Sequence, residues 1–271
     1  MIDYHIHTPL CNHANGSMEE YVLSAIGKGL TEICFLDHFI ASGPGTRHSM
    51  SAGEIPLYMQ AIACLRHRYR DRITIRAGLE VDFLPEEKTL IEDILGRYDF
   101  DAVGGSFHFV RGINVASRKL QIPEAPAERD ALMETYFEGL IRMLDWPYFD
   151  FFCHVDVVKR SGIEVPLHLE PLVDEFLRRL SEKGLALEFN ASGWNHPCGE
   201  GYPAEHLVRR CFDLQIPFTL GSDAHSPSNV GAHFDKALAV LAGAGYTELS
   251  AFEGRKGKRL PLKNETCRFL S

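Results

Sequence analysis

Short apolar runs alternate with longer amphipathic segments along most of this 271-residue chain. An apolar run of about four to eight residues is typical of a buried strand, and apolar residues three or four apart are typical of a helix. Repetition of this pair produces parallel strands covered by helices. The pattern therefore predicts an α/β protein in which seven parallel strands form a barrel. The seven expected strands are Ile2–His5, Glu32–Leu36, Ile73–Val81, Ala102–Phe107, Phe149–His154, Ala186–Phe189 and Phe218–Leu220.

Other features of the chain fit a single unit. No linker divides it, so residues 1–271 are expected to form one domain. Ser17 and Glu20 form a capping box, which predicts a helix start directly after the first loop. Irregular stretches at 41–53, 111–126 and 192–202 follow strands two, four and six, so they belong to one end of the barrel. The segment 246–271 has little clear pattern and is expected to pack as an extension.

Charge and cysteine usage narrow the class of protein. A formal net charge of −9 argues against nucleic acid as the main partner, because such binding depends on Lys and Arg at phosphates. The first twenty residues lack the basic and apolar segments of a signal peptide, and no apolar run is long enough to span a membrane. Seven cysteines without a C-x-x-C pair suit a reducing compartment. We therefore expect a cytoplasmic protein.

Residues that bind metals recur where the expected strands end. All strands but the sixth end in, or are closely followed by, such a residue. Because the carboxyl ends of the strands of a parallel barrel meet at one rim, these side chains should surround one pocket. The ten residues are His5, His7, His13, Asp37, His38, Glu80, His108, His154, Asp223 and His225.

The spacing of these residues supports the same prediction. His5 and His7, like Asp223 and His225, are two residues apart, which in extended chain places both side chains on one side about 6–7 Å apart. A single His-x-His is equally typical of two surface residues. With thirteen histidines in the chain, their placement at the ends of five of seven strands indicates a metal site.

The runs that carry these residues resemble the polymerase and histidinol phosphatase (PHP) family, and the resemblance spans residues 3–225. Within the family the chain is most similar to stand-alone histidinol-phosphate phosphatases, notably in 104–109, 154–160 and 189–193. The matching runs are Asp3-Tyr4-His5-Ile6-His7, His13, Leu36-Asp37-His38, Gly78-Leu79-Glu80, Ser106-Phe107-His108, Cys153-His154 and Gly221-Ser222-Asp223-Ala224-His225.

The resemblance implies a distorted (β/α)7 barrel of the TIM type. It also implies three divalent metal ions, of zinc, iron or manganese, at the carboxyl ends of the strands. Glu80 would bridge the first two ions. The three ligand sets that it implies are His5, His7, Glu80 and Asp223; then Glu80, His108 and His154; and then His13, His38 and His225.

The expected reaction is hydrolysis of a phosphomonoester, with L-histidinol phosphate, an intermediate of histidine biosynthesis, as the substrate that the resemblance implies. Two carboxylates and seven neutral imidazoles leave three divalent ions with about four unmatched positive charges, which favours an anionic substrate. A hydroxide between the two ions that share Glu80 would attack phosphorus. Glu80, Asp223 and His225 are the expected catalytic residues.

Two further residues have roles that the sequence leaves open. Asp37 precedes His38 and either orients an imidazole or caps a helix. Arg160, six residues after His154, is either a bidentate clamp for phosphate or a surface residue at the start of a helix.

Three other functions remain as alternatives. One is a PHP phosphoesterase that acts on nucleotides or short oligonucleotides. Another is a urease-type amidohydrolase, although that family typically has a metal-bridging lysine on strand four and no His two residues after the final Asp. The third is a non-catalytic metal-bearing module that binds a partner.

Overall fold

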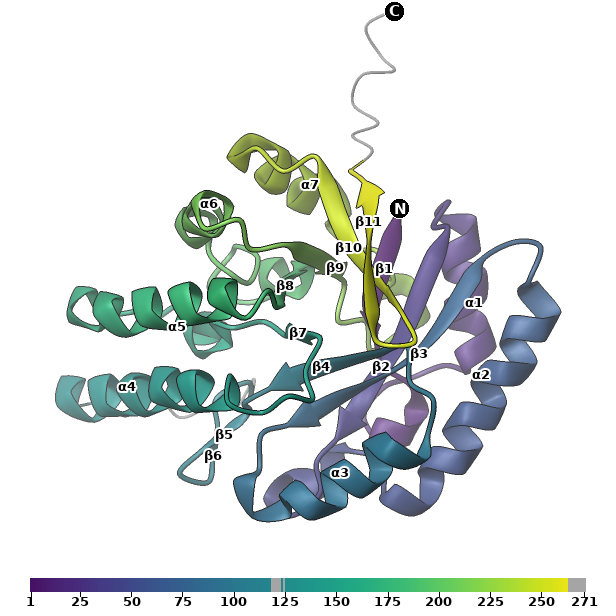
Figure 1. The fold of residues 1–271 in the computed structure, drawn as a ribbon, viewed down its shortest axis with the longest axis horizontal. Helices are drawn as coiled ribbons and strands as arrows, with labels where there is room; N and C mark the ends of the chain where they lie inside the picture. The colour runs from purple at the N-terminus through teal and green to yellow at the C-terminus, as the bar shows by residue number, and fades with distance from the viewer. Residues whose placement is uncertain (118–122, 124, 263–271) are drawn as a thin grey trace, which may run out of the picture.

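Seven parallel strands form a nearly closed barrel in the computed structural model, which describes residues 1–117, 123 and 125–262 (Figure 1). Their order around the barrel follows the order of the chain, as expected for repeated βα units. The TIM-like architecture predicted from the sequence is confirmed. The barrel strands are β1 (Ile2–Ile6), β2 (Glu32–Phe39), β3 (Thr74–Asp82), β4 (Ala102–Ser106), β7 (Phe151–Phe152), β8 (Ala186–Asn190) and β9 (Phe218–Gly221).

All seven expected strands are present, with different bounds at several ends. The second strand continues to Phe39 and the third to Asp82, so both reach further into the rim than predicted. The fifth is wrong in length: only Phe151–Phe152 pairs as a strand, and the chain leaves the extended conformation at His154, where φ is 26°.

The barrel closes where the first strand meets the segment after the last one. The backbone N–H of His7 donates to the carbonyl of Ala224 over 3.0 Å, and the N–H of Ala224 donates to the carbonyl of His5 over 3.2 Å. These bonds place the start of the chain directly beside Asp223. His5 and His7 are therefore held against the barrel wall rather than in a loose end.

Seven helices cover the outside of the barrel in the described part of the chain (Figure 1). The predicted capping box is confirmed, because Ser17 N–H donates to Glu20 Oε2 over 2.6 Å and Glu20 N–H donates to Ser17 Oγ over 3.4 Å. None of these helices is long and apolar enough to cross a membrane. They are α1 (Met18–Gly27), α2 (Ile55–Tyr69), α3 (Lys88–Arg97), α4 (Pro126–Met143), α5 (Glu170–Glu182), α6 (Glu205–Asp213) and α7 (Phe234–Ala244).

The strands are buried on both faces, as parallel strands between a barrel interior and a helical layer must be. Every residue of β1, β4, β8 and β9 is buried. Apolar side chains fill most of these positions, yet Asp3, His5 and Glu188 are fully buried among them. Buried charged groups at this depth need partners. The partners of these three side chains lie at the carboxyl end of the barrel.

A hairpin of β10 (Glu248–Glu253) and β11 (Lys256–Pro261) lies across the opposite, amino-terminal mouth of the barrel (Figure 1). The hydroxyl of Tyr4 donates to the carbonyl of Phe252 over 2.9 Å and accepts from its N–H over 2.7 Å. The extension expected at 246–271 is thus packed as predicted up to residue 262, but it is a regular hairpin, which the prediction missed. Residues 263–271 lie outside the described part.

A short hairpin begins just before the irregular stretch expected at 111–126 and ends within it. Its strands are β5 (Phe109–Val110) and β6 (Ile113–Asn114), and they stand at the same end of the barrel as the predicted metal site. Residues 118–122 and 124 of this stretch lie outside the described part.

Candidate metal centre

The nine side chains predicted as metal ligands come together at the carboxyl ends of the strands. Six of them line a cavity of about 970 Å³ at this rim, namely His13, His38, His108, His154, Asp223 and His225. Five of the nine are buried, namely His5, His7, Glu80, His108 and His154. The four nearer to solvent are His13, His38, Asp223 and His225.

Glu80 lies at the centre of the group, and its two carboxylate oxygens face different histidines. Oε1 is 2.9 Å from Nε2 of His154 and 3.5 Å from Nε2 of His108. Oε2 is 2.7 Å from Nδ1 of His38 and 3.4 Å from Nε2 of His5. Ligand atoms that share one zinc ion lie about 3–3.5 Å apart, since each is about 2.0–2.2 Å from the metal. Glu80 therefore has the geometry of a carboxylate shared between two ions.

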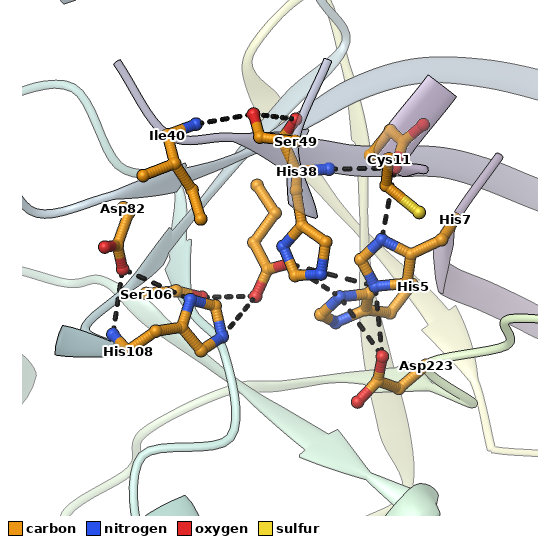
Figure 2. Close-up of polar contacts among 12 residues, drawn as sticks. His5, His7, Cys11, His38, Ile40, Ser49, Asp82, Ser106, His108 and Asp223 are labelled. Atoms are coloured by element: carbon orange, nitrogen blue, oxygen red, sulfur yellow. Dashed lines mark hydrogen bonds and ion pairs between the residues drawn. The ribbon is translucent and has the colours of Figure 1, made fainter. Parts of the chain in front are cut away.

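His5, His7 and Asp223 form a second part of the same cluster. Nε2 of His7 lies 3.0 Å from Oδ1 of Asp223, and Nε2 of His5 lies 3.9 Å from the same oxygen. Figure 2 shows the three side chains pointing toward one another, with His38 and His108 directed into the same space. Asp223 has a φ of 53°, a conformation that costs energy in a residue with a side chain and is typical of functional sites.

His13 and His225 make the outermost pair, with their Nε2 atoms 2.9 Å apart. Nδ1 of His13 lies 2.8 Å from the carbonyl of Cys11, and Nδ1 of His225 lies 3.0 Å from the carbonyl of Asp223. A carbonyl oxygen only accepts, so both Nδ1 atoms carry the proton and both Nε2 atoms present a lone pair. His38 lies close by, its ring centroid 5.4 Å from that of His13.

Unpartnered polar atoms test whether these residues fit metal ions. Nε2 of His5, Nδ1 of His38 and Oε2 of Glu80 are buried and make no hydrogen bond within the described residues. Each such atom costs about 1–3 kcal/mol if it stays unsatisfied. Both nitrogens lie close to this carboxylate oxygen, at 3.4 Å for His5 and 2.7 Å for His38, and a divalent cation bound here would satisfy such atoms. The donor set of imidazoles and carboxylates therefore fits the metals that the sequence implied.

Electrostatics keep the central carboxylates ionised. Burial raises the pKa of Glu80, but the imidazoles of His38, His5 and His108 outweigh it and hold that pKa well below its usual range. Asp223 behaves in the same way: burial opposes ionisation, and the neighbouring His5 and His7 lower its pKa well below normal. Both groups are thus ready to bind cations without first losing a proton.

Three buried carboxylates outside the nine contact the Nδ1 atoms of ligand-type imidazoles. Such a contact fixes the ring orientation and directs Nε2 toward the centre, which is how metal-binding histidines are usually held. The pairs are Glu188 with His5 at 2.7 Å, Asp37 with His7 at 3.3 Å and Asp82 with His108 at 3.2 Å.

Asp37, for which the sequence left two roles open, is buried beside one of the predicted ligands. It lies within β2, where it accepts from the N–H of His38 over 3.0 Å and from the hydroxyl of Thr8, and it contacts the ring of His7. The imidazole that it contacts belongs to His7 rather than to the adjacent His38.

Glu188 is the residue that the sequence pattern did not single out. It lies on β8, the one strand without a metal-type residue at its end, and it is fully buried. Its other oxygen accepts from the N–H of His154 over 3.0 Å and from Nδ2 of Asn190 over 3.1 Å. A Cβ on Gly221 would lie 1.9 Å from Glu188 Oε1, so the neighbouring strand needs glycine there. An acidic residue inside a buried strand was the available signal.

Arg160 lies in a short 3₁₀ helix, η5 (Val157–Ser161), and lines the cavity beside the metal-type residues. Its Nη1 donates to the carbonyl of Ala116 over 2.6 Å, which holds the guanidinium against the β5–β6 hairpin. It is therefore a partly buried residue of the cavity wall, placed where an anionic substrate would approach.

The fold and this site together define a metal-dependent protein of the TIM-like barrel class, with its metal centre at the carboxyl rim. A model of the PHP domain family matches residues 3–192. The chain belongs to the PHP domain family, as the sequence resemblance implied.

Individual relatives agree with this assignment. A probable histidinol-phosphatase of Deinococcus radiodurans is 34% identical over 90% of this chain and 94% of its own length. The histidinol-phosphatase of Bacillus subtilis is 28% identical over 87% of this chain and 97% of its own. The crystal structure of a histidinol phosphate phosphatase from Lactococcus lactis, complexed with zinc, L-histidinol and phosphate, has a TM-score of 0.82 and 26% identity. It covers 95% of this chain and 98% of its own.

Proposed function

We propose that this protein is a metal-dependent phosphatase that hydrolyses L-histidinol phosphate to L-histidinol and phosphate. The observation that carries the proposal is the cluster of carboxylates and imidazoles around Glu80, in which Nε2 of His5, Nδ1 of His38 and Oε2 of Glu80 make no hydrogen bond within the described residues. The Lactococcus lactis relative, which binds zinc, L-histidinol and phosphate, supports the choice of substrate.

The charges at the site favour a phosphate ester. Three divalent ions with two carboxylate ligands and seven neutral imidazoles retain about four positive charges. The buried carboxylates behind the imidazoles, Asp37, Asp82 and Glu188, offset about three of these, so the site stays positive and favours an anionic ester. When bound, the ions supply Lewis acidity and activate water for attack on phosphorus. Their number, three, and their identity, as zinc, iron or manganese, are part of the proposal.

The protein's own residues position the reacting groups. Glu80 joins the histidines at its Oε1 to those at its Oε2 and so fixes the separation of these two groups of ligands. The hydroxyl of Ser106 donates a hydrogen bond to Oε1 of Glu80. Ser192 donates to Asp223 Oδ2 over 3.1 Å, which leaves Oδ1 directed to the histidines. His225 completes the outer group at the cavity mouth, where it would hold an oxygen of the substrate through its ion. Arg160 would bind a phosphate oxygen from the opposite wall.

The proposal assigns the whole of residues 1–271 to one catalytic domain that acts on a small phosphorylated substrate. Six described cysteines are free thiols, which fits the reducing environment of the cytoplasm. Strand β4 has the sequence Ala-Val-Gly-Gly-Ser and carries no lysine, so the metal-bridging group of a urease-type amidohydrolase is missing from it.

Two measurements test this function. Elemental analysis of the purified protein should find close to three equivalents of divalent metal. Steady-state turnover of L-histidinol phosphate should then exceed that of other phosphomonoesters, including a generic aryl phosphate and mononucleotides. Equal turnover of all esters would reject the specific substrate, and metal-loaded protein without any phosphatase activity would reject the enzyme.

A further inference from the structure

A buried lysine that takes no part in metal binding links the loops of the cavity wall. Lys159 lies in η5, and its side chain is only 7% exposed. Its ammonium group contacts three oxygens: Oδ2 of Asp156 at 2.9 Å, Oε1 of Glu200 at 3.0 Å and the carbonyl of Gly201 at 2.9 Å. These three contacts use the full donor capacity of an ammonium group.

The partners of Lys159 belong to two different segments of the rim. Asp156 lies in its own loop after β7, and the same Asp156 oxygen accepts from the N–H of Ala204 over 2.8 Å. Glu200 and Gly201 lie in the loop between β8 and α6, and Lys159 also lies over the ring of Tyr202, 5.5 Å from its centroid. A single buried cation therefore joins the loop after β7 to the loop after β8.

The next residue extends this link to a third segment. The carbonyl of Arg160 accepts from the N–H of Cys198 over 3.4 Å, and its guanidinium donates to the carbonyl of Ala116 beside the β5–β6 hairpin. Arg160 thus sits between the two other segments, with its backbone held on one side and its side chain on the other. All three segments line the cavity, at Ala116, Arg160 and Asn195 among others.

We propose that Lys159 is a positioning residue that fixes Arg160 in the cavity wall, so that the substrate's phosphate group meets a preformed guanidinium. The inference rests on the proposed function for the presence of a phosphate group in the cavity. A buried charge is costly unless it is fully paired, and removal of one partner leaves the others uncompensated. The loop holding Arg160 would then shift, and a displacement of about 1 Å is enough to weaken a positioned contact.

Two substitutions test this link, one by weakening it and the other by removing it. Glu200→Gln removes one charge from a half-exposed partner, and Lys159→Met removes the cation itself. Inorganic phosphate is the probe, because its affinity for the metal-loaded protein, measured by calorimetry, needs no turnover. We expect the dissociation constant for phosphate, and KM for L-histidinol phosphate, to rise about threefold in the first variant and about tenfold in the second. Bound metal should stay unchanged, and kcat should fall less than KM rises.

The same substitutions in an Arg160→Ala background separate positioning from general stability. If Lys159 acts through Arg160, neither substitution weakens phosphate binding further once Arg160 is gone. Arg179→Gln, which breaks a 2.7 Å ion pair with Asp145 away from the cavity, is the matched control and should leave phosphate affinity unchanged. If Lys159→Met does not fold, Glu200→Gln alone decides the comparison.

The outcomes distinguish this inference from the proposed function. Equal weakening of phosphate binding with and without Arg160, or a lower unfolding midpoint with unchanged phosphate affinity, would overturn the positioning role. If the protein does not turn over L-histidinol phosphate but phosphate binding still depends on Lys159 through Arg160, the positioning role stands and the substrate assignment falls.

Discussion

Nε2 of His13 and Nε2 of His225 face each other across 2.9 Å. Burial and the neighbouring His7 lower the pKa of His225 well below its usual value, and burial lowers that of His13, so both rings are neutral. Two neutral rings with Nδ1 bonded to carbonyls would bring two lone pairs together, which is repulsive without a cation beside them. The pair is best explained as two ligands of one metal ion.

Loss of His13 should therefore remove one ion without removing the others. His13→Ala is expected to lower the metal content by about one equivalent. It should also lower kcat/KM by about 100-fold or more, because loss of a residue that contacts a metal only indirectly already costs about 10- to 100-fold in activity. Elemental analysis and steady-state kinetics on the same preparation would check this. Unchanged metal content would show that His13 is not a ligand.

Substitution of Glu80 should affect two ions at once. Glu80→Gln keeps the shape of the side chain but removes the charge that both buried groups share, so the protein should lose up to two equivalents of metal and nearly all activity. The comparison with His13→Ala, which removes one equivalent, is the control. Full activity and full metal content in Glu80→Gln would rule out the bridging role.

The contact between Glu188 and His5 predicts a milder effect. Glu188→Gln retains one oxygen but removes the negative charge 2.7 Å from Nδ1 of His5, so the ring loses its fixed orientation and part of its basicity. Metal affinity should fall about 10- to 100-fold while the fold is kept. Titration with a metal-binding dye gives the affinity, and circular dichroism the fold. An affinity equal to that of the unchanged protein would contradict this role.

Metal affinity should increase with pH. Burial lowers the pKa of His7, but its hydrogen bonds with Asp223 and Asp37 outweigh burial and raise that pKa to about 9 in the metal-free protein. Burial likewise opposes protonation of His5, but nearby Glu188 and Glu80 outweigh it and raise the pKa of His5 as well. A cation must displace these protons at neutral pH, so affinity should rise by at least about tenfold per pH unit below pH 9. Chelator competition between pH 6 and 10 measures the profile. A flat profile below pH 9 would show that no such proton is displaced.

The sequence predicted the parts of the site that lie at strand ends, because in a parallel barrel position along the chain determines position on the rim. His5, His108 and His154 were found in this way. Glu188 was not, because it lies two residues inside its strand, and its role depends on the ring of a residue 183 positions away. Only the closed barrel shows that pairing.

The hairpin at 248–261 was missed for a different reason. Its second strand, Lys256–Pro261, is largely exposed and rich in Lys and Arg, so it lacks the apolar run by which the barrel strands were recognised. Its position depends on Tyr4 at the other end of the chain and on Lys258, which pairs with Glu32 at 3.0 Å. Contacts of this separation carry no local signal.

Anomalous X-ray diffraction from crystals of the metal-loaded protein tests the central claim most directly, because it locates each ion relative to its ligands. Three peaks are predicted at the carboxyl rim, two of them on either side of the Glu80 carboxylate and the third between His13 and His225. A map without peaks at this rim, or with Glu80 bound to no ion, would contradict the account.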